Sequence, residues 1–261
     1  MKNNPIGLFD SGVGGTSIWK EVLKVLPNES TIYLADSANA PYGEKDKQTI
    51  INLCIKNTEL LLAKGCKIII VACNTATTNA IDYLRSSYKV PFIGIEPAIK
   101  PAALFSKTGA IGILATKGTL ASALFEKTAQ TYTQNITTIR QDGQGLVPLV
   151  EKGDLESEEV SVLLKKYLQP MIDKNIDHLV LGCTHYPYLI PAIQKIIGNE
   201  VRIIDSGEAV ARQTKAILTK NDLLASHEKP HHELLTNENK AVLESLVQDV
   251  AISKEITQIK F

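Results

Sequence analysis

The 261-residue chain has no surplus of either charge and no long apolar run. Lysine plus arginine and aspartate plus glutamate both number 28, and the resulting net charge of zero argues against a general nucleic-acid binder. The longest unbroken apolar run, Ile68–Cys73, is far shorter than the ~20 residues that a membrane helix needs. The segment Met1–Asp10 contains no secretory core. We therefore expect a cytoplasmic protein that binds neither nucleic acid nor a membrane.

Cysteine is also scarce, and the chain has no C-x-x-C pair. The histidines do not stand at zinc-finger spacing from the cysteines, so we expect no metal. With 44% hydrophobic residues, a chain of this length can build a core without disulfides or metals. Cys54 and Cys66 lie within or just after a helical pattern, and we expect both to be core residues.

Short apolar runs alternate along the chain with longer amphipathic stretches, an order typical of an α/β fold with parallel sheets. The expected strands are Ile6–Phe9, Thr31–Ala35, Ile68–Ala72, Phe92–Ile95, Ala110–Leu114, Ile136–Arg140, His178–Leu181 and Val201–Ile204. The expected helical stretches include Lys47–Ala63, Thr77–Tyr88, Thr119–Tyr132 and Glu156–Lys174.

An internal repeat divides this pattern into two similar halves. The segment Ile6–Ser11 reappears as Ile111–Thr116, and Val71–Thr75 reappears as Leu181–His185, each roughly 105 to 110 residues later. We therefore expect two pseudo-symmetric open parallel-sheet α/β domains that face each other across a cleft. A TIM barrel is the alternative that eight strand–helix pairs would also suit, and the repeat weighs against it. Ligands of open sheets bind at the carboxyl ends of the strands, so the two halves would enclose one site.

We expect the first domain to comprise residues 1–96 together with a C-terminal helical tail, residues 207–261, and the second domain to comprise residues 97–206. The tail has no counterpart in the repeat. Within it, Ser226–His232 has the composition of a surface loop, and we expect the adjacent His231 and His232 to be solvated.

Cys73 and Cys183 occupy equivalent places in the two halves, where each ends a predicted strand and precedes a helical run. A thiol at the positive end of a helix dipole loses its proton more readily. His185, two residues after Cys183, could assist further. The repeat thus predicts two reactive thiols on opposite walls of one cleft, and simple core packing is the competing interpretation for each.

Two polar turns follow the first two strands. The glycine-rich turn Phe9–Gly15 lacks the lysine and spacing of nucleotide-binding loops, which favours recognition of a small carboxylate instead. Asp10 either faces the cleft from the end of its strand or caps the helix beginning near Thr16. The loop Ala35–Gly43, which contains a Pro-Tyr-Gly turn, is either a site wall or a plain surface turn.

Taken together, these motifs resemble those of glutamate racemases, within the wider cofactor-independent aspartate/glutamate racemase superfamily. The resemblance covers roughly residues 5–215. The segment Gln141–Gly145 departs from the Cys-Pro-type sequence that many relatives carry there. The matching motifs are Phe9–Gly15, Pro41–Gly43, Ala72–Ala76, Val147–Glu151 and Gly182–Pro187.

The resemblance implies interconversion of L- and D-glutamate by two cysteines, which supplies D-glutamate for peptidoglycan. Cys73 would take the α-proton of D-glutamate and Cys183 that of L-glutamate, one acting as thiolate while the other acts as thiol. Asp10 would assist Cys73, and Glu151 and His185 would assist Cys183. The resemblance also implies a homodimer and no cofactor, because two thiols remove the need for a lysine Schiff base with pyridoxal phosphate.

The expected substrate contacts come from the resemblance and from the repeat. The repeat adds Thr116 and Thr119, which stand at the turn equivalent to the glycine-rich turn, and Asp36 matches a further acidic position that the family uses. The contacts that the resemblance implies are Asp10, Ser11, Pro41, Tyr42, Gly43, Asn74, Thr75, Thr184 and His185.

Three alternatives stay open at this point. A related racemase of aspartate or hydantoin would keep both cysteines, and a non-catalytic carboxylate-binding module would merely pack them. A thiol redox protein would need the two sulfurs within disulfide reach, which leaves no room for a substrate between them. Because the first motif begins at Phe9, we expect no activation by a UDP-muramyl peptide, which some relatives link to an N-terminal extension.

Overall fold

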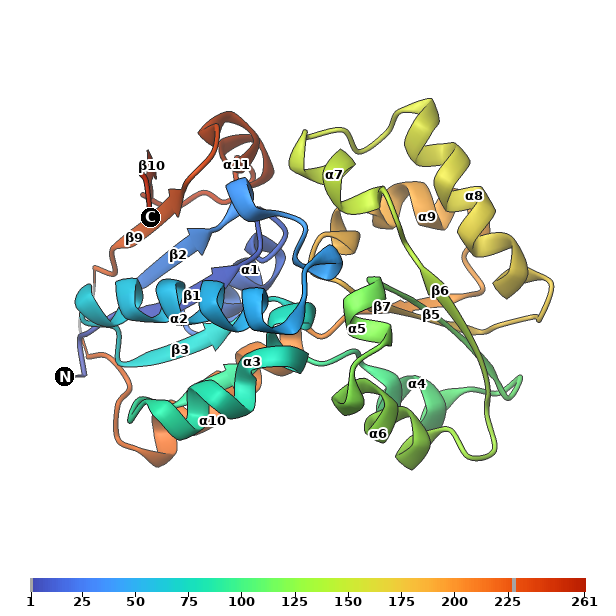
Figure 1. The fold of residues 1–261 in the computed structure, drawn as a ribbon, viewed down its shortest axis with the longest axis horizontal. Coiled ribbons are helices and arrows are strands. Elements are labelled where there is room, and N and C mark those ends of the chain that lie inside the picture. Colours follow the sequence, from blue (N-terminus) through green and yellow to red (C-terminus); the bar gives the residue numbers. More distant parts are fainter. Residues whose placement is uncertain (1, 227–228) are drawn as a thin grey trace.

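A computed structural model describes residues 2–226 and 229–261. Within these residues the strands form two parallel sheets, which lie in the two halves of the molecule (Figure 1). The larger sheet has the order β10-β9-β2-β1-β3-β4, and the smaller has the order β6-β5-β7-β8. The strands are β1 (Ile6–Asp10), β2 (Thr31–Ala35), β3 (Ile68–Val71), β4 (Phe92–Gly94), β5 (Ala110–Ala115), β6 (Thr137–Asp142), β7 (His178–Gly182), β8 (Arg202–Ile204), β9 (His232–Thr236) and β10 (Glu255–Gln258).

Helices connect the strands. The stretch expected as one helix over Thr119–Tyr132 is two, because the Ser122 side chain accepts from Phe125 N–H and starts a new helix. The α-helices are α1 (Thr16–Val25), α2 (Lys47–Ala63), α3 (Asn74–Ser87), α4 (Ile99–Phe105), α5 (Lys117–Leu120), α6 (Ala123–Tyr132), α7 (Leu146–Glu151), α8 (Glu158–Ile172), α9 (Ile190–Ile197), α10 (Gly207–Lys220) and α11 (Lys240–Leu246). The 3₁₀ turns are η1 (Ser37–Asn39), η2 (Tyr42–Glu44) and η3 (Tyr186–Leu189).

The two halves share one strand order, β2-β1-β3-β4 in the first and β6-β5-β7-β8 in the second. This correspondence confirms the predicted pair of open parallel-sheet α/β domains. Neither sheet closes on itself within the described part of the chain, so the barrel alternative is wrong. The strand order reverses between β1 and β3 and between β5 and β7. Open α/β sheets bind ligands at such points, outside the carboxyl ends of the strands.

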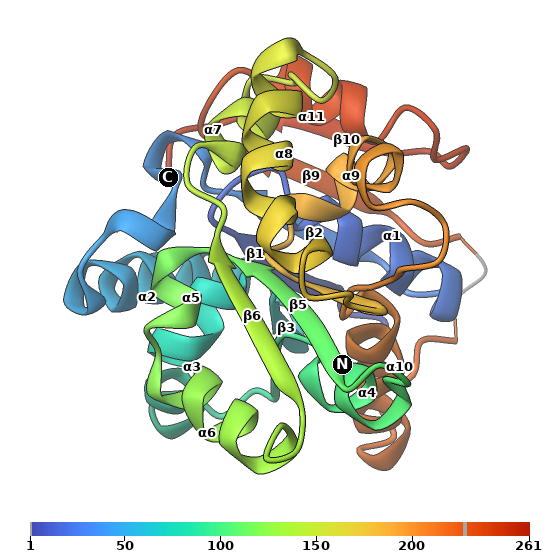
Figure 2. The ribbon, with the colours of Figure 1, turned by 90° about the vertical axis from the view of Figure 1, so that its right-hand side faces the viewer.

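Alternating side chains of each strand enter different cores. In β3, Ile68 and Ile70 pack with the core that includes α1 and α10, whereas Ile69 and Val71 pack with α2 and α3. The first of these cores continues into the second half, where it includes α8 and α9, and so joins the two halves. A third core lies on the other face of the second sheet, under α4 and α6 (Figure 2).

The C-terminal tail is only partly helical, contrary to our expectation. Helix α10 packs against α1, but β9 and β10 then extend the first sheet beside β2. Tyr33 lies opposite Leu234 in this pairing. The domain boundaries at residues 96 and 207 stay a prediction.

The expectation of a solvated histidine pair is wrong for His232, which begins β9 and is buried. Its Nδ1 lies 2.9 Å from Thr31 Oγ1, and its ring meets the edge of the Trp19 ring. Burial lowers the pKa of His232 to about 4, so the ring is neutral at physiological pH. His231 is exposed, as expected.

Candidate active site

Residues that follow β1, β2, β3, β5 and β7 meet in one enclosed cavity between the halves. Its volume is about 10 Å³, enough for roughly one water molecule. Substrates larger than water therefore enter only when the walls move. The lining residues are Ser11, Pro41, Tyr42, Gly43, Cys73, Asn74, Thr75, Thr116, Val147, Gly182, Cys183, Thr184 and His185.

Cys73 is the residue immediately before α3, and its Sγ accepts from Ala76 N–H at 3.4 Å. A second contact joins Cys73 Sγ to Ser11 Oγ at 3.6 Å. We expected the helix terminus to favour the thiolate. Instead, burial and the nearby Asp10 carboxylate raise the pKa of Cys73 well above its ordinary value, and they outweigh the two hydrogen bonds. Cys73 is therefore a thiol in this structure.

Cys183 has a different environment, because the residues after it form the 3₁₀ turn η3 before α9 begins. The helical run expected after Pro187 starts as this turn, and its regular part begins only at Ile190, so Cys183 is not the residue immediately before an α-helix as Cys73 is. The positive charge near the Cys183 sulfur comes instead from His185. Its Nδ1 lies 3.7 Å from Cys183 Sγ, and its Nε2 lies 2.5 Å from Glu151 Oε1. Burial alone would lower the pKa of His185, but hydrogen bonds to Cys183 and Glu151 raise it well above its ordinary value. The ring is therefore an imidazolium at neutral pH.

Asp10 lies behind the cavity wall and is fully buried. Its Oδ2 accepts from the N–H groups of Gly12 and Gly15, at 3.2 and 2.9 Å, and its Oδ1 accepts from Thr184 Oγ1 at 3.2 Å. Burial nevertheless dominates and raises the pKa of Asp10 to about 6, while the charge of His185 and the backbone donors oppose the rise. The carboxyl thus titrates near neutral pH and links the two halves through Thr184.

Two glycines of the glycine-rich turn, Gly12 and Gly14, pack closely against residues of the second half. A Cβ atom on Gly12 would overlap the Glu151 carboxylate, and one on Gly14 would overlap the His185 ring. Val13 N–H donates to Glu151 Oε1 at 2.7 Å. The turn therefore receives two carboxylates of the protein itself, those of Asp10 and Glu151, where we expected a small ligand carboxylate.

A triangle of threonine hydroxyls joins the halves at another wall of the cavity. Thr75 Oγ1 lies 2.8 Å from Thr116 Oγ1 and 3.3 Å from Thr119 Oγ1, and Thr116 donates to Thr119 at 3.0 Å. Of the three, Thr75 and Thr116 line the cavity, while Thr119 lies behind them. Gly43 also packs against Thr116, since a Cβ atom on Gly43 would come within 3.0 Å of the Thr116 Cβ atom.

A larger cavity of about 700 Å³ adjoins this wall and shares Pro41, Gly43, Thr116 and Val147 with the small one. The shared residues belong to the turn η2 and its partners in the second half. Separation of Gly43 from Thr116 would therefore connect the enclosed cavity to the larger one.

Asp36 does not line the cavity and is fully buried behind Tyr42. The Tyr42 hydroxyl donates to Asp36 Oδ2, and Asn39 Nδ2 donates to Asp36 Oδ1 at 2.8 Å. Asp36, which we expected as a further acidic position of the site, thus contacts the residues of the cavity wall from behind.

Sequence reasoning missed the lining residues Val147 and Gly182, although both lie in motifs that carried the resemblance. It also missed Asn237, which contacts Asp36 from the tail. Nothing in the local sequence distinguishes Asn237, because its position depends on the pairing of β9 with β2.

Among the described residues, no group of three or more histidine, cysteine, aspartate or glutamate side chains is arranged to hold a metal ion. None of the helices within residues 2–226 and 229–261 has the length and hydropathy of a membrane span.

The fold and site together define an α/β protein with two repeated sheets and a pair of thiols in a buried cavity between them. The sequence profile of the Asp/Glu/Hydantoin racemase family matches residues 14–214. The chain belongs to this family. A glutamate racemase of Clostridium perfringens is 42% identical over 263 aligned residues, which cover 100% of this chain and 98% of that protein.

Two solved structures are similar over the whole chain. A glutamate racemase isoform from Bacillus anthracis superimposes with a TM-score of 0.87 at 30% identity, covering 100% of this chain and 99% of that one. The glutamate racemase of Francisella tularensis, solved with D-glutamate, has a TM-score of 0.84 at 30% identity, with 100% and 98% covered.

Proposed function

We propose that the chain is a glutamate racemase that moves the α-proton of glutamate between two cysteines without a cofactor. The observation that carries the proposal is the enclosed cavity that Cys73 and Cys183 line together. Full-length similarity to glutamate racemases, one of them solved with D-glutamate, supports glutamate as the substrate. The product D-glutamate would serve peptidoglycan synthesis, as is typical of the family.

The reaction begins with Cys183 as thiolate and Cys73 as thiol. With L-glutamate bound, the Cys183 sulfur takes the α-proton and leaves an electron pair on the α-carbon. The Cys73 thiol then delivers its own proton to the opposite face, which gives D-glutamate. Cys183 ends as thiol and Cys73 as thiolate, so the same steps in reverse convert D-glutamate to L-glutamate.

His185 and Glu151 support the thiolate on Cys183. The imidazolium places a positive charge 3.7 Å from the Cys183 sulfur, and Glu151 holds the ring in place through its other nitrogen. In a buried site such a charge is screened little by water. We therefore assign both residues as supports of the Cys183 base.

Asp10 has the corresponding place beside Cys73. Its negative charge opposes a thiolate on Cys73, so the resting thiol keeps the proton that the first half-reaction requires. When Cys73 acts as the base, protonation of Asp10, whose pKa is about 6, would remove that opposition. Asp10 thereby tunes the second cysteine rather than touching substrate.

Substrate recognition falls to the polar groups of the cavity wall. The Asn74 amide nitrogen is buried and has no hydrogen-bond partner among the residues that the structure describes. Because an unpaired buried donor is costly, a substrate carboxylate is a suitable partner for it. The hydroxyls of Ser11, Thr75, Thr116 and Thr184 also line the cavity, and Ser11, which accepts from Cys73 Sγ, keeps its own proton as a further donor. Exclusion of water by the closed walls would help to stabilise a carbanion-like transition state.

The test is proton exchange followed by NMR, with L-glutamate in D₂O and no added cofactor. We expect deuterium at the α-carbon together with D-glutamate, and loss of this conversion in Cys73→Ala and in Cys183→Ala. Cys66→Ala is the matched control, since this thiol is buried away from the cavity, and it should keep the activity. Conversion of aspartate or a hydantoin but not glutamate would assign the enzyme to a related substrate. No turnover of any of the three would favour a binding module.

We further propose that the enzyme is a homodimer of the cytoplasm, as the resemblance implies. Light scattering coupled to size-exclusion chromatography tests the dimer, and a monomer at micromolar concentration would contradict it.

A further inference from the structure

The C-terminal tail reaches the wall of the active cavity through Asp36. Strand β9 runs beside β2 with Thr236 opposite Ala35, so Asp36 and Asn237 meet at the ends of adjacent strands. Asn237 Nδ2 donates to Asp36 Oδ1 at 2.5 Å, and Asn237 Oδ1 accepts from Ala38 N–H at 2.9 Å. One amide side chain thus holds both the carboxylate and the turn η1 that follows it.

The second oxygen of Asp36 holds Tyr42, the first residue of η2. The Tyr42 hydroxyl donates to Asp36 Oδ2 and accepts from Asn57 Nδ2 at 3.2 Å. Burial and the charge of Asp36 raise the pKa of Tyr42 far above its ordinary value, so the hydroxyl stays a donor. Because Tyr42 and Gly43 line the cavity and Gly43 packs on Thr116, a shift of Asp36 would move the wall.

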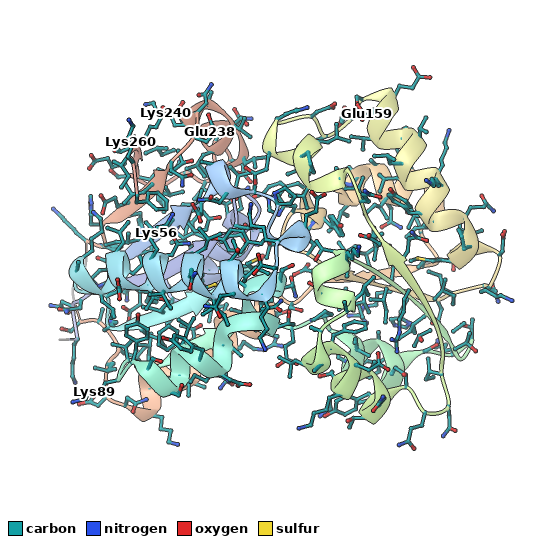
Figure 3. The ribbon with its side chains drawn as sticks, viewed as in Figure 1. Lys56, Lys89, Glu159, Glu238, Lys240 and Lys260 are labelled. Carbon is teal, nitrogen blue, oxygen red and sulfur yellow. The ribbon has the colours of Figure 1, made fainter. Side chains whose placement is uncertain are left out.

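Lys56 adds a second link between the tail and Asp36. Its Nζ lies 3.4 Å from Asp36 Oδ1, donates to the Phe261 carbonyl oxygen at 3.1 Å and lies 5.2 Å from the centre of the Phe261 ring. Figure 3 labels Lys56 on α2 and, above it in that view, Glu238 and Lys260 of the tail. The tail therefore reaches Asp36 directly through Asn237 and indirectly through the contact of Phe261 with Lys56.

We propose that Asn237 is a positioning residue for the racemisation reaction. Through Asp36 and Tyr42, it holds the turn η2 in place at the wall of the active cavity. The inference rests on the proposed function. Several donors on one buried carboxylate fix its orientation, and a network of this kind loses order when one member is removed. The cysteines follow β3 and β7, which Asn237 does not touch, so its loss should weaken substrate binding more than proton transfer.

The experiment compares Asn237→Ala with Glu238→Gln, which changes the adjacent exposed residue. Loss of a hydrogen bond to a carboxylate predicts that KM for glutamate rises about tenfold in Asn237→Ala, with kcat within twofold of the wild type. The control should keep both constants. A KM within twofold of the control would overturn the inference. If the alanine variant does not fold, the isosteric Asn237→Asp, which keeps the acceptor for Ala38, is judged by the same criterion.

A double-mutant cycle with Tyr42→Phe tests the route. If Asn237 acts through the Tyr42 hydroxyl, Asn237→Ala should change KM less than twofold further in the Tyr42→Phe background. A further tenfold rise in KM in that background would mean that Asn237 acts independently of the Tyr42 hydroxyl, which also overturns the inference. Wild-type enzyme that fails to racemise glutamate would instead refute the proposed function, so the two failures are distinguishable.

Discussion

Replacing Asp10 with asparagine should change how the stability of the protein depends on pH. In the folded protein the pKa of Asp10 is about 6, against an ordinary value of 3.8. The folded state therefore binds more protons than the unfolded state between these values, so Asp10 contributes stability at low pH that is lost as pH rises through about 6. The difference between the two pKa values corresponds to about 3 kcal/mol in total, of which about 2 kcal/mol is lost between pH 4.5 and 7.5.

Urea unfolding of the wild type and of Asp10→Asn at these two pH values measures the effect. Titrating groups remote from Asp10 are the same in both proteins and cancel in the difference between the two unfolding free energies. The pKa values of its neighbours Cys73 and His185 are raised well above their ordinary values, so neither group is expected to titrate much between these two pH values. As pH rises from 4.5 to 7.5, the unfolding free energy of the wild type should fall by about 2 kcal/mol relative to that of Asp10→Asn. A constant difference would mean that burial does not perturb Asp10. A difference that grows with pH would mean that the donors from Gly12, Gly15 and Thr184 outweigh burial, which would refute the reasoning.

Three further changes test other parts of the structure. Glu151→Gln removes the partner charge of His185 and should lower kcat/KM for racemisation about 10- to 100-fold, measured by polarimetry; an unchanged value would contradict the assigned support. Gly14→Ala should abolish turnover and lower the melting temperature measured by calorimetry, because its Cβ would overlap the His185 ring; a wild-type melting temperature would show that the turn can move aside. His232→Gln should flatten the pH dependence of urea unfolding. Because the pKa of His232 is about 4, the unfolding free energy of the wild type should fall by up to about 3 kcal/mol as pH falls from 6.5 towards 4. An equal dependence of the unfolding free energy on pH in the variant would argue against a buried neutral ring.

Most of the first eight strands were predictable because their apolar runs are short, β-branched and repeated in the second half. Strand β6, which is mainly polar, was predictable from its place in the repeat. The strands of the tail were not, since β9 contains the polar residues His232 and Glu233 and has no repeat partner. His232 illustrates the limit, because its burial depends on Thr31 and Trp19, about two hundred positions away. Pairings at that separation follow from strand order, which no local pattern specifies.

For the site, the ends of the repeated strands predicted Cys73, Cys183 and the residues beside them. The protonation state of Cys73 was predicted less well, because we expected the helix terminus to determine the pKa of its thiol. Burial and Asp10 dominate instead, and neither can be judged before the two halves are assembled. The same is true of Gly12 and Gly14, whose place opposite Glu151 and His185 is visible only across the interface.

The repeat explains why there are two bases, but the departure from it explains why they are not alike. Equivalent strand ends carry Cys73 beside the carboxyl of Asp10 and Cys183 beside the imidazolium of His185. Under the proposed function, the form of the free enzyme with its thiolate at Cys73 is disfavoured by burial and by Asp10. Because the two enantiomers have equal free energy in water, this asymmetry cannot favour one direction in kcat/KM. It determines instead which form of the free enzyme accumulates, and each conversion of L- to D-glutamate leaves the less stable form, with the thiolate at Cys73, to be reset by proton exchange or by a molecule of D-glutamate.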